Sequence, residues 1–264
     1  IGVAMRTGQV TFRNLTLPTR DKKAIMAGVG FELEDELPFS LDDAVYDYSI
    51  LSQTKQATML HVAATLKKHI VPFLAPWQNP VATSGVDPDL ITSEAWAYRA
   101  LLNRVSANQP ASSAKTPAKG ATIDPDSPPV LLVQIGHERT SLYLHWHGSP
   151  VLAREISWGG RDLTLAICQK YQIPLEQAES AKLDHGFVVP EAQKADATPE
   201  QMEFSDTLMA PISELISAIR QAELSCKNTT HQNLGKIYVT GGSSLLPGLN
   251  KVLEESLHVP VRPL

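Results

Sequence analysis

The sequence predicts a mixed α/β protein. Segments in which apolar residues alternate, as in strands, are interspersed with segments in which they recur every three or four positions, as in helices. Strands and helices in mixed order build α/β architectures. The chain has 264 residues, 43% of them hydrophobic, which is enough for a sizeable core. Near the C-terminus, a short apolar strand runs into two glycines and then into a predicted helix.

Composition and charge exclude several classes of protein. The formal net charge is −5 and no long run of lysine and arginine is present, which argues against nucleic acid as the main partner. The sequence contains no stretch of about 18 apolar residues, which is the length needed to span a bilayer. Cys168 and Cys226 both fall in predicted helices, so a reducing cytosol is expected rather than a disulfide scaffold. Because Ile1 already lies in a predicted strand, we expect the natural N-terminus to lie upstream.

The first part of the chain predicts a β-α-β-β-α unit. Its first β segment consists of two short strands at 1–5 and 9–17, and a helix at Lys22–Leu37, strands at 45–51 and 58–66, and a helix at 67–76 follow. In the first helix, apolar residues recur every four positions. Thr19 or Asp21 can cap its start, and Pro38 stops it.

The next two segments differ sharply in composition. Residues 84–105 predict the edge of a strand and then a helix from about Ser93 to Val105. Residues 106–129 are rich in proline, alanine, serine and lysine and contain almost no large apolar residue. Such a segment buries too little surface to offset its ordering entropy, so we predict a mobile and dispensable linker.

The second half predicts a sheet with several helices. The predicted elements are three strands between 130 and 158 with a tight turn at His147-Gly148, helices at Arg161–Tyr171 and Leu175–Leu183, a loop at 188–197, a helix at Pro199–Lys227, a strand at 236–240, a helix at 245–257 and a final strand from 259. Pro211 lies inside the longest helix, where we expect a kink or a break.

Gly241, Gly242 and Ser243 form the sharpest local motif. The two glycines stand where a strand turns into a predicted helix, and without a Cβ they let a ligand or another backbone approach closely. The start of a helix also offers unpaired N–H groups that suit a phosphate or a nucleoside. The alternative is a tight turn that serves packing alone, and the motif by itself does not decide between the two.

A second motif is the hairpin "LLVQIGHERTSLYL", with Gly136 at its turn. This layout resembles the phosphate-binding hairpin of actin-like ATPases, in which Asp-x-Gly precedes a polar turn. Here Gln134 stands where the acidic residue is expected. A carboxylate at that place organises a metal and its waters, and an amide does so poorly.

Taken together, the fragments "SEAWAYRALL", "IGHERTSLYL", "GGRDLTLAI", "AESAK" and "VTGGSSLLPGL" resemble, in order, the actin-like PilM/GspL family of type IV pilus and type II secretion assembly proteins. The resemblance implies an actin-like (DnaK/FtsA-like) ATPase fold that lacks its N-terminal phosphate-loop segment. It assigns 1–83 to an inserted small α/β subdomain (1C-like), 84–105 to the return helix of subdomain 1A, 106–129 to a linker, and 130–264 to the second actin-like half (2A/2B-like).

The resemblance also implies a vestigial nucleotide site. Glu179 and Lys182 match the Ala-Glu-x-x-Lys helix that touches ribose and adenine in actin-like proteins, and Gly241, Gly242 and Ser243 match the adenosine turn. With Gly136, these residues make half of a nucleotide site. Since the first phosphate loop is absent and Gln134 replaces the second acidic residue, we expect no ATP hydrolysis, no catalytic residue and no metal ligand. No cofactor is expected, and ATP with Mg²⁺ would bind only if an upstream phosphate loop exists.

The function implied is that of a scaffold, cytoplasmic and peripheral to the bacterial inner membrane. The wording "IGHERTS" with "GGRDLT" favours a GspL-like member of a type II secretion system that links the secretion ATPase to membrane partners. The alternatives are a type IV pilus assembly protein of the PilM type and a genuine FtsA- or DnaK-like ATPase. The partners implied are a secretion or pilus ATPase and assembly-platform proteins (GspE/GspM-like or PilN-like), and a homodimer is left open.

A scaffold acts by binding, and the predicted subdomain offers a candidate surface. Glu34 and Glu36 put negative charge near a helix C-terminus, where the helix dipole disfavours it, so a basic partner is one explanation. Tyr46, Asp47 and Tyr48 lie on a strand that suits a sheet edge, where unpaired backbone groups and tyrosines favour partner binding. The alternative is that both tyrosines pack against the helix at 22–37.

Overall fold

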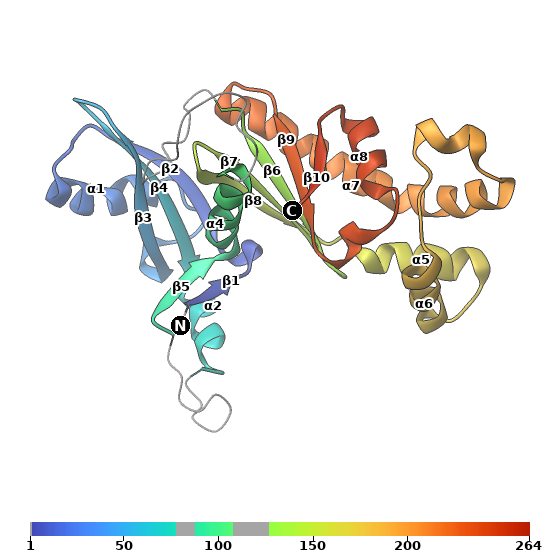
Figure 1. Cartoon of the computed structure of the whole chain (residues 1–264). Helices are drawn as coiled ribbons and strands as arrows, with labels where there is room; N and C mark the ends of the chain where they lie inside the picture. Colours follow the sequence, from blue (N-terminus) through green and yellow to red (C-terminus); the bar gives the residue numbers. More distant parts are fainter. Residues whose placement is uncertain (1, 78–87, 108–126) are drawn as a thin grey trace. The chain divides into compact units, whose positions relative to one another are not determined.

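The computed structural model describes residues 2–77, 88–107 and 127–264 (Figure 1). The chain forms two compact units. Unit 1 comprises Ile1–Lys119 and Gly148–Ala153, and unit 2 comprises Gly120–His147 and Arg154–Leu264. Most of the predicted linker at 106–129 lies outside the described residues, so its predicted mobility is not addressed by the structure.

Unit 1 contains a three-stranded antiparallel sheet in the order β2-β4-β3. Its strands are β2 (Thr11–Leu17), β3 (Ala44–Gln53) and β4 (Thr58–Leu66). Alternate residues of β4 point to opposite faces, so Leu60, Val62 and Ala64 form one apolar face and are buried. β3 lies at one edge of this sheet, as the sequence predicts for a partner-binding strand.

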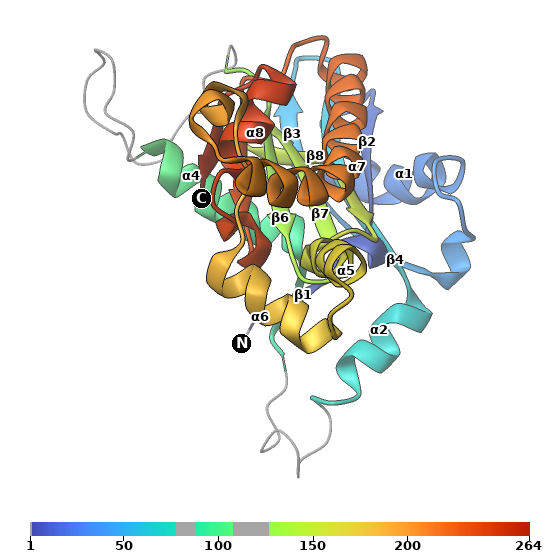
Figure 2. The same cartoon turned by 90° about the vertical axis from the view of Figure 1, so that its right-hand side faces the viewer.

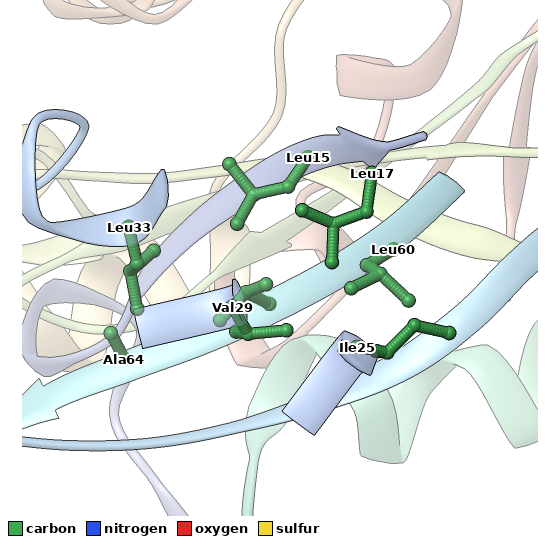
Figure 3. Close-up of a cluster of buried hydrophobic side chains, with 8 residues drawn as sticks. Leu15, Leu17, Ile25, Val29, Leu33, Leu60 and Ala64 are labelled. Atoms are coloured by element: carbon green, nitrogen blue, oxygen red, sulfur yellow. The ribbon is translucent and has the colours of Figure 1, made fainter. Parts of the chain in front are cut away.

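Helix α1 (Lys22–Glu34) covers the apolar face of this sheet. It begins at the predicted cap, because the Asp21 carboxylate accepts a hydrogen bond from the backbone N–H of Ala24 at 2.8 Å. Figure 3 shows the cluster that its buried residues form with β2 and β4, namely Leu15, Leu17, Ile25, Val29, Leu33, Leu60, Val62 and Ala64. Each large aliphatic side chain in such a cluster contributes about 1.5–3 kcal/mol of transfer free energy.

The first strand, β1 (Gly2–Met5), does not join this sheet. It pairs in parallel with β5 (Leu90–Ser93), which leads into α4 (Glu94–Ala107). β1 therefore lies with the segment predicted as 84–105 rather than with the rest of 1–83. The described part of unit 1 also contains η1 (Thr7–Gln9), η2 (Leu41–Asp43) and α2 (Lys67–Leu74).

The five-stranded sheet has the order β10-β9-β6-β7-β8. Its strands are β6 (Val130–Ile135), β7 (Thr140–Trp146), β8 (Ser149–Ile156), β9 (Lys236–Thr240) and β10 (Val261–Pro263). β6 runs antiparallel to β7 and parallel to β9, and β9 runs parallel to β10. The predicted tight turn between β7 and β8 is confirmed, with φ of 49° at His147 and 69° at Gly148.

The described part of unit 2 also contains four α-helices, of which α7 packs on β7 (Figure 2). They are α5 (Gly160–Tyr171), α6 (Leu175–His185), α7 (Pro199–Thr230) and α8 (Leu249–Leu257). Thr198 caps α7 through a reciprocal capping box with Gln201. Of the kink or break expected at Pro211, the break is wrong, since α7 continues through the proline, and the kink stays a prediction. Buried Leu208, Ile212 and Leu215 on both sides of the proline hold the helix against its neighbours.

Two further expectations for unit 2 need correction. The segment expected as a loop at 188–197 contains the 3-10 helix η3 (Glu191–Asp196). The last helix, predicted from 245, begins only at Leu249, after the 3-10 helix η4 (Gly242–Leu245). Gly248 explains the delay, because its φ of +86° is not helical and a Cβ there would lie 1.9 Å from the carbonyl oxygen of Val188. Within the described residues, no helix is both long and apolar enough to cross a membrane.

Candidate functional site

The two glycines of the Gly-Gly-Ser turn serve different purposes. Gly241 has a φ of +93°, and a Cβ at this position would lie 2.3 Å from the carbonyl oxygen of Ile135. Only glycine lets the turn approach β6 this closely, so packing alone accounts for Gly241. A Cβ on Gly242 would meet no atom within 4 Å, and Gly242 is exposed. Packing therefore does not explain the second glycine.

The same turn is tied to the β6–β7 hairpin and to the start of α5. The Ser243 hydroxyl donates a hydrogen bond to the carbonyl of Gly136 at 2.9 Å, and the backbone N–H of Gly160 donates to the same carbonyl at 3.0 Å. Arg161 N–H donates to the carbonyl of His137 at 2.7 Å. The first donors of α5 are thus already used by the hairpin, so they are not available to a phosphate.

Lys182 lies at the centre of a buried polar network. Its side chain is 8% exposed, and its ammonium donates to the Gly160 carbonyl, to Thr164 Oγ1 and to Glu179 Oε2, each at 2.8 Å. The Thr164 hydroxyl is in turn hydrogen bonded to the Gly160 carbonyl and to Glu179. All three protons of the ammonium therefore have acceptors within the protein.

This network also sets the ionisation of Glu179. Partial burial favours the neutral carboxyl, but the hydrogen bonds from Lys182 and Thr164, with the Lys182 charge, outweigh it and lower the pKa of Glu179. There is no room at Gly160 for a side chain, since a Cβ would lie 2.2 Å from Ser243 Oγ. The network joins α5, α6 and the Gly-Gly-Ser turn into one closely packed group.

The structure therefore brings the predicted nucleotide residues together, and most of them are hydrogen bonded to one another, Lys182 to Glu179 and Ser243 to Gly136. A neighbouring cavity of about 330 Å³ is lined by His137, Arg161, Thr164, Leu175, Glu176 and Glu179. Of the predicted set, only Glu179 lines it. The arrangement does not fit a phosphate, because Lys182 and the N–H groups of Gly160 and Arg161 are already hydrogen bonded. Sequence reasoning missed Gly160 and Thr164, although both stand in the "GGRDLT" fragment.

The predicted partner residues of unit 1 separate into three groups. Tyr46 and Tyr48 pack against the cluster beneath α1, as the alternative reading of these tyrosines holds. Asp47 is exposed and points to the opposite face of β3. Glu34 and Glu36 are exposed, but Arg13 donates to the Glu36 carbonyl at 2.8 Å and lies 3.7 Å from its carboxylate. A partner role for the two glutamates stays a prediction.

The face of the sheet opposite α1 borders a groove of about 370 Å³ within unit 1. On β3 it is lined by Val45, Asp47 and Ser49, and on β4 by His61, Ala63 and Thr65. These residues share one face of the sheet, because Ser49 pairs with His61, Asp47 with Ala63 and Val45 with Thr65. The other lining residues are Met5, Val10, Tyr46, Tyr48, Ala64, Ile70, Leu90, Ile91, Thr92, Ser93 and Trp96.

The groove is apolar and open to a ligand. Val45 is 44% exposed, Leu90 59% and Ile91 36%, so its rim presents large hydrophobic side chains to solvent. Sequence reasoning found the edge strand β3 but missed the contributions of β4 and β5. The alternating pattern of "TMLHVAATL" was the available signal, since it places His61 on the face opposite Leu60 and Val62.

His61 is the most perturbed titratable group of the groove. Its side chain is only 1% exposed, and its ring stacks on Phe12 with centroids 5.2 Å apart. Its Nδ1 lies 2.7 Å from Oδ1 of Asn14. Burial, together with the charge of Arg99, lowers the pKa of His61 to about 4, so the ring is neutral at physiological pH.

Comparison with known families places the chain. The profile of the family described as type IV pilus assembly protein PilM matches residues 1–262. The chain belongs to this PilM family. Of the alternatives open at the sequence level, the PilM one is therefore supported, whereas the preference for a type II secretion protein finds no support in the comparisons.

Individual relatives agree on the fold. A structure of a PilM-PilN type IV pilus biogenesis complex matches 97% of this chain with a TM-score of 0.68 and 23% identity. The structure of MreB 5 of Spiroplasma citri bound to AMPPNP is similar over 75% of this chain and 60% of the MreB 5 chain, with a TM-score of 0.51 and 17% identity. Cell division protein FtsA of Borreliella burgdorferi is 27% identical over 146 residues, half of this chain. The predicted actin-like α/β fold is confirmed.

The PilM-family chain is shorter than the proteins it matches. It spans 66% of the matched chain in the PilM-PilN complex and 35% of FtsA. The similarity to the complex shows the fold of this chain, and what that PilM protein assembles with is a property of that protein.

Proposed function

We propose that this PilM-family chain is a scaffold of a type IV pilus assembly platform, on the cytoplasmic side of the inner membrane, and that it binds an extended segment of a PilN-like membrane partner. The observation that carries the proposal is the open apolar groove beside the edge strand β3 of unit 1. The occupant is argued from the matched structure, in which a PilM protein is in complex with PilN.

The groove suits a peptide for two physical reasons. An edge strand presents unpaired N–H and C=O groups, to which an extended segment can add as a further strand. The exposed apolar residues on its rim, Val45, Leu90 and Ile91, offer contacts for alternate side chains of that segment. A linking role between the pilus ATPase and the membrane partner would follow from a second surface, for which the acidic turn at Glu34 and Glu36 is our candidate.

The test is to fill the groove while leaving the core intact. Ala63 lines the groove from β4, so Ala63→Trp should occupy the space of a bound segment. Met59 lies on the same face of the same strand, is 42% exposed and does not line the groove, so Met59→Trp is the matched control. Calorimetry with overlapping synthetic peptides that span the PilN-like protein of the same organism should show at least a tenfold loss of affinity for Ala63→Trp and less than a twofold change for Met59→Trp.

Equal binding by both variants, with circular dichroism and melting temperatures like those of the parent chain, would remove the groove from the proposal.

We also propose that the chain does not hydrolyse ATP. The support is Gln134 in place of a metal-organising carboxylate and the internal hydrogen bonding of Lys182, Gly160 and Arg161. Steady-state phosphate release from ATP with Mg²⁺ should equal that of a buffer blank. Release above the blank that Gly242→Val abolishes would contradict the proposal, since a Cβ at Gly242 would meet no atom within 4 Å and packing does not explain this glycine.

A further inference from the structure

Two buried polar atoms in the groove of unit 1 have no hydrogen-bond partner among the described residues. They are Nε2 of His61 and Oγ of Ser49. The two residues face each other across the β3–β4 pair, so their Cβ atoms are neighbours on the same face of the sheet. They are not hydrogen bonded to each other. Buried polar groups are nearly always paired in folded proteins, so two adjacent orphans lining an open groove point to a ligand that pairs with them.

The tautomer of His61 defines what it can accept. An amide oxygen only accepts hydrogen bonds, so the Nδ1 of His61, 2.7 Å from Asn14 Oδ1, carries the ring proton. Nε2 therefore carries an unpaired lone pair on a residue that lines the groove. Ser49 supplies a hydroxyl, which can donate to a carbonyl oxygen.

Aromatic neighbours fix the direction of this acceptor. Phe12 stacks on the His61 ring at an interplanar angle of 11°, and Trp96 approaches it at 60° with centroids 5.6 Å apart. Arg99 lies over Trp96, 4.7 Å from the ring centroid. The imidazole is thereby held between two elements, with Nδ1 toward β2 and Nε2 left for a ligand.

We infer that Ser49 and His61 form a recognition pair for one residue of the bound extended segment, whose backbone N–H donates to His61 Nε2 and whose backbone C=O accepts from Ser49 Oγ. In an extended segment the N–H and C=O of one residue point to the same side, whereas those of a single trans amide point to opposite sides. A carboxylate has no proton to donate to Nε2, and an ammonium has no acceptor for Ser49. This inference rests on the proposed function, since it concerns the occupant of the same groove.

Two substitutions test the pair from the protein side. Ser49→Ala removes only the hydroxyl and should weaken the best-binding PilN-like peptide about fivefold to tenfold, because a buried hydrogen bond is lost. Ser52→Ala, on the same strand but outside the groove, is the matched control and should change affinity less than twofold. His61→Phe keeps an aromatic ring on Phe12 and should weaken binding about tenfold.

Backbone methylation of the peptide tests the pair from the ligand side. A scan in which each peptide N–H is replaced by N-methyl should find one position that costs about tenfold with the parent chain but less than twofold with His61→Phe, because the acceptor is already gone. Methylation that costs the same in both proteins at every position, or unchanged binding by both Ser49→Ala and His61→Phe, would overturn the inference. If Ala63→Trp also binds normally, the groove proposal itself fails; if Ala63→Trp abolishes binding, only the recognition pair fails.

Discussion

The polar network of unit 2 around Lys182 and the groove of unit 1 differ in the hydrogen bonding of their buried polar atoms. In the network, the Lys182 ammonium has three protein acceptors, and the Gly136 carbonyl accepts from both Ser243 and Gly160. In the groove, His61 Nε2 and Ser49 Oγ have none, and large apolar side chains line the exposed rim. The polar groups of the network pair with one another, whereas two buried polar atoms of the groove have no partner among the described residues.

The difference shows why resemblance to a ligand site does not locate the ligand. The residues that match the nucleotide motif are close together, yet the hydrogen bonds of the Lys182 ammonium and the Ser243 hydroxyl go to other groups of the protein. The groove matches no sequence motif, yet it has buried polar atoms without a hydrogen-bond partner and exposed apolar side chains. A bound partner would pair with the polar atoms and cover the apolar surface.

The strongest test separates the two glycines of the turn. Gly241→Ala should lower the free energy of unfolding by about 4 kcal/mol, because a Cβ at a φ of +93° would lie 2.3 Å from the Ile135 carbonyl oxygen. Gly242→Ala should change it by less than about 1 kcal/mol, since its Cβ meets nothing within 4 Å. Urea unfolding followed by circular dichroism measures both. Equal effects would show that packing does not distinguish the two glycines.

Acidification should weaken unit 1 through His61. Burial, with the charge of Arg99, lowers the pKa of His61 from 6.5 to about 4, so the unfolded chain binds a proton more readily than the folded chain between these values. The contribution is full above pH 6.5 and is lost as the pH falls toward 4, by about 3 kcal/mol in total. Unfolding free energies measured across this range should show the slope, and His61→Phe should flatten it. A slope that persists in His61→Phe would assign it to other groups.

Breaking the network of unit 2 should cost less. Lys182→Met removes the ammonium and leaves Glu179 without its charge partner, which should destabilise the fold by about 2 kcal/mol. Lys170→Met breaks an exposed ion pair with Glu203 and should have no measurable effect. Because the network lowers the pKa of Glu179, the stability it gives is present above the ordinary value of 4.5 and is lost on acidification below it. Thermal melts of the two variants would be compared, and equal losses would contradict the burial argument.

The smallest effect is expected at the acidic turn after α1. Arg13→Ala removes the hydrogen bonds to the carbonyls of Glu36 and Phe12, which should cost about 1 kcal/mol. The exposed Arg20→Ala is the control. A measurable loss of unfolding free energy would mean that Arg13 already pairs with the acceptors of this turn, as Lys182 pairs with its neighbours. No loss, with weaker binding of the assembly ATPase by a Glu34→Lys, Glu36→Lys double variant, would show a surface left for a partner.

Local patterns in the sequence determined most of the elements. The period of the apolar residues predicted α1, α5, α7 and the strands of the three-stranded and five-stranded sheets, and a capping residue, Thr19 or Asp21, predicted the start of α1. These signals suffice because backbone hydrogen bonding and capping act over a few residues. The order of the fragments was also enough to indicate the actin-like fold and the PilM/GspL family, although the preference for the GspL branch found no support in the comparisons.

Only the tertiary structure decided which faces meet. The pairing of β1 with β5, the continuation of α7 through Pro211 and the late start of α8 at Leu249 all depend on contacts between residues far apart in the chain. The same holds for function. The Lys182 ammonium is hydrogen bonded within the protein because Gly160 and Thr164 lie beside it. In His61, Nδ1 contacts Asn14, whereas Nε2 has no partner among the described residues. Whether a polar group is available to a ligand depends on its neighbours in space, and a one-dimensional pattern does not contain them.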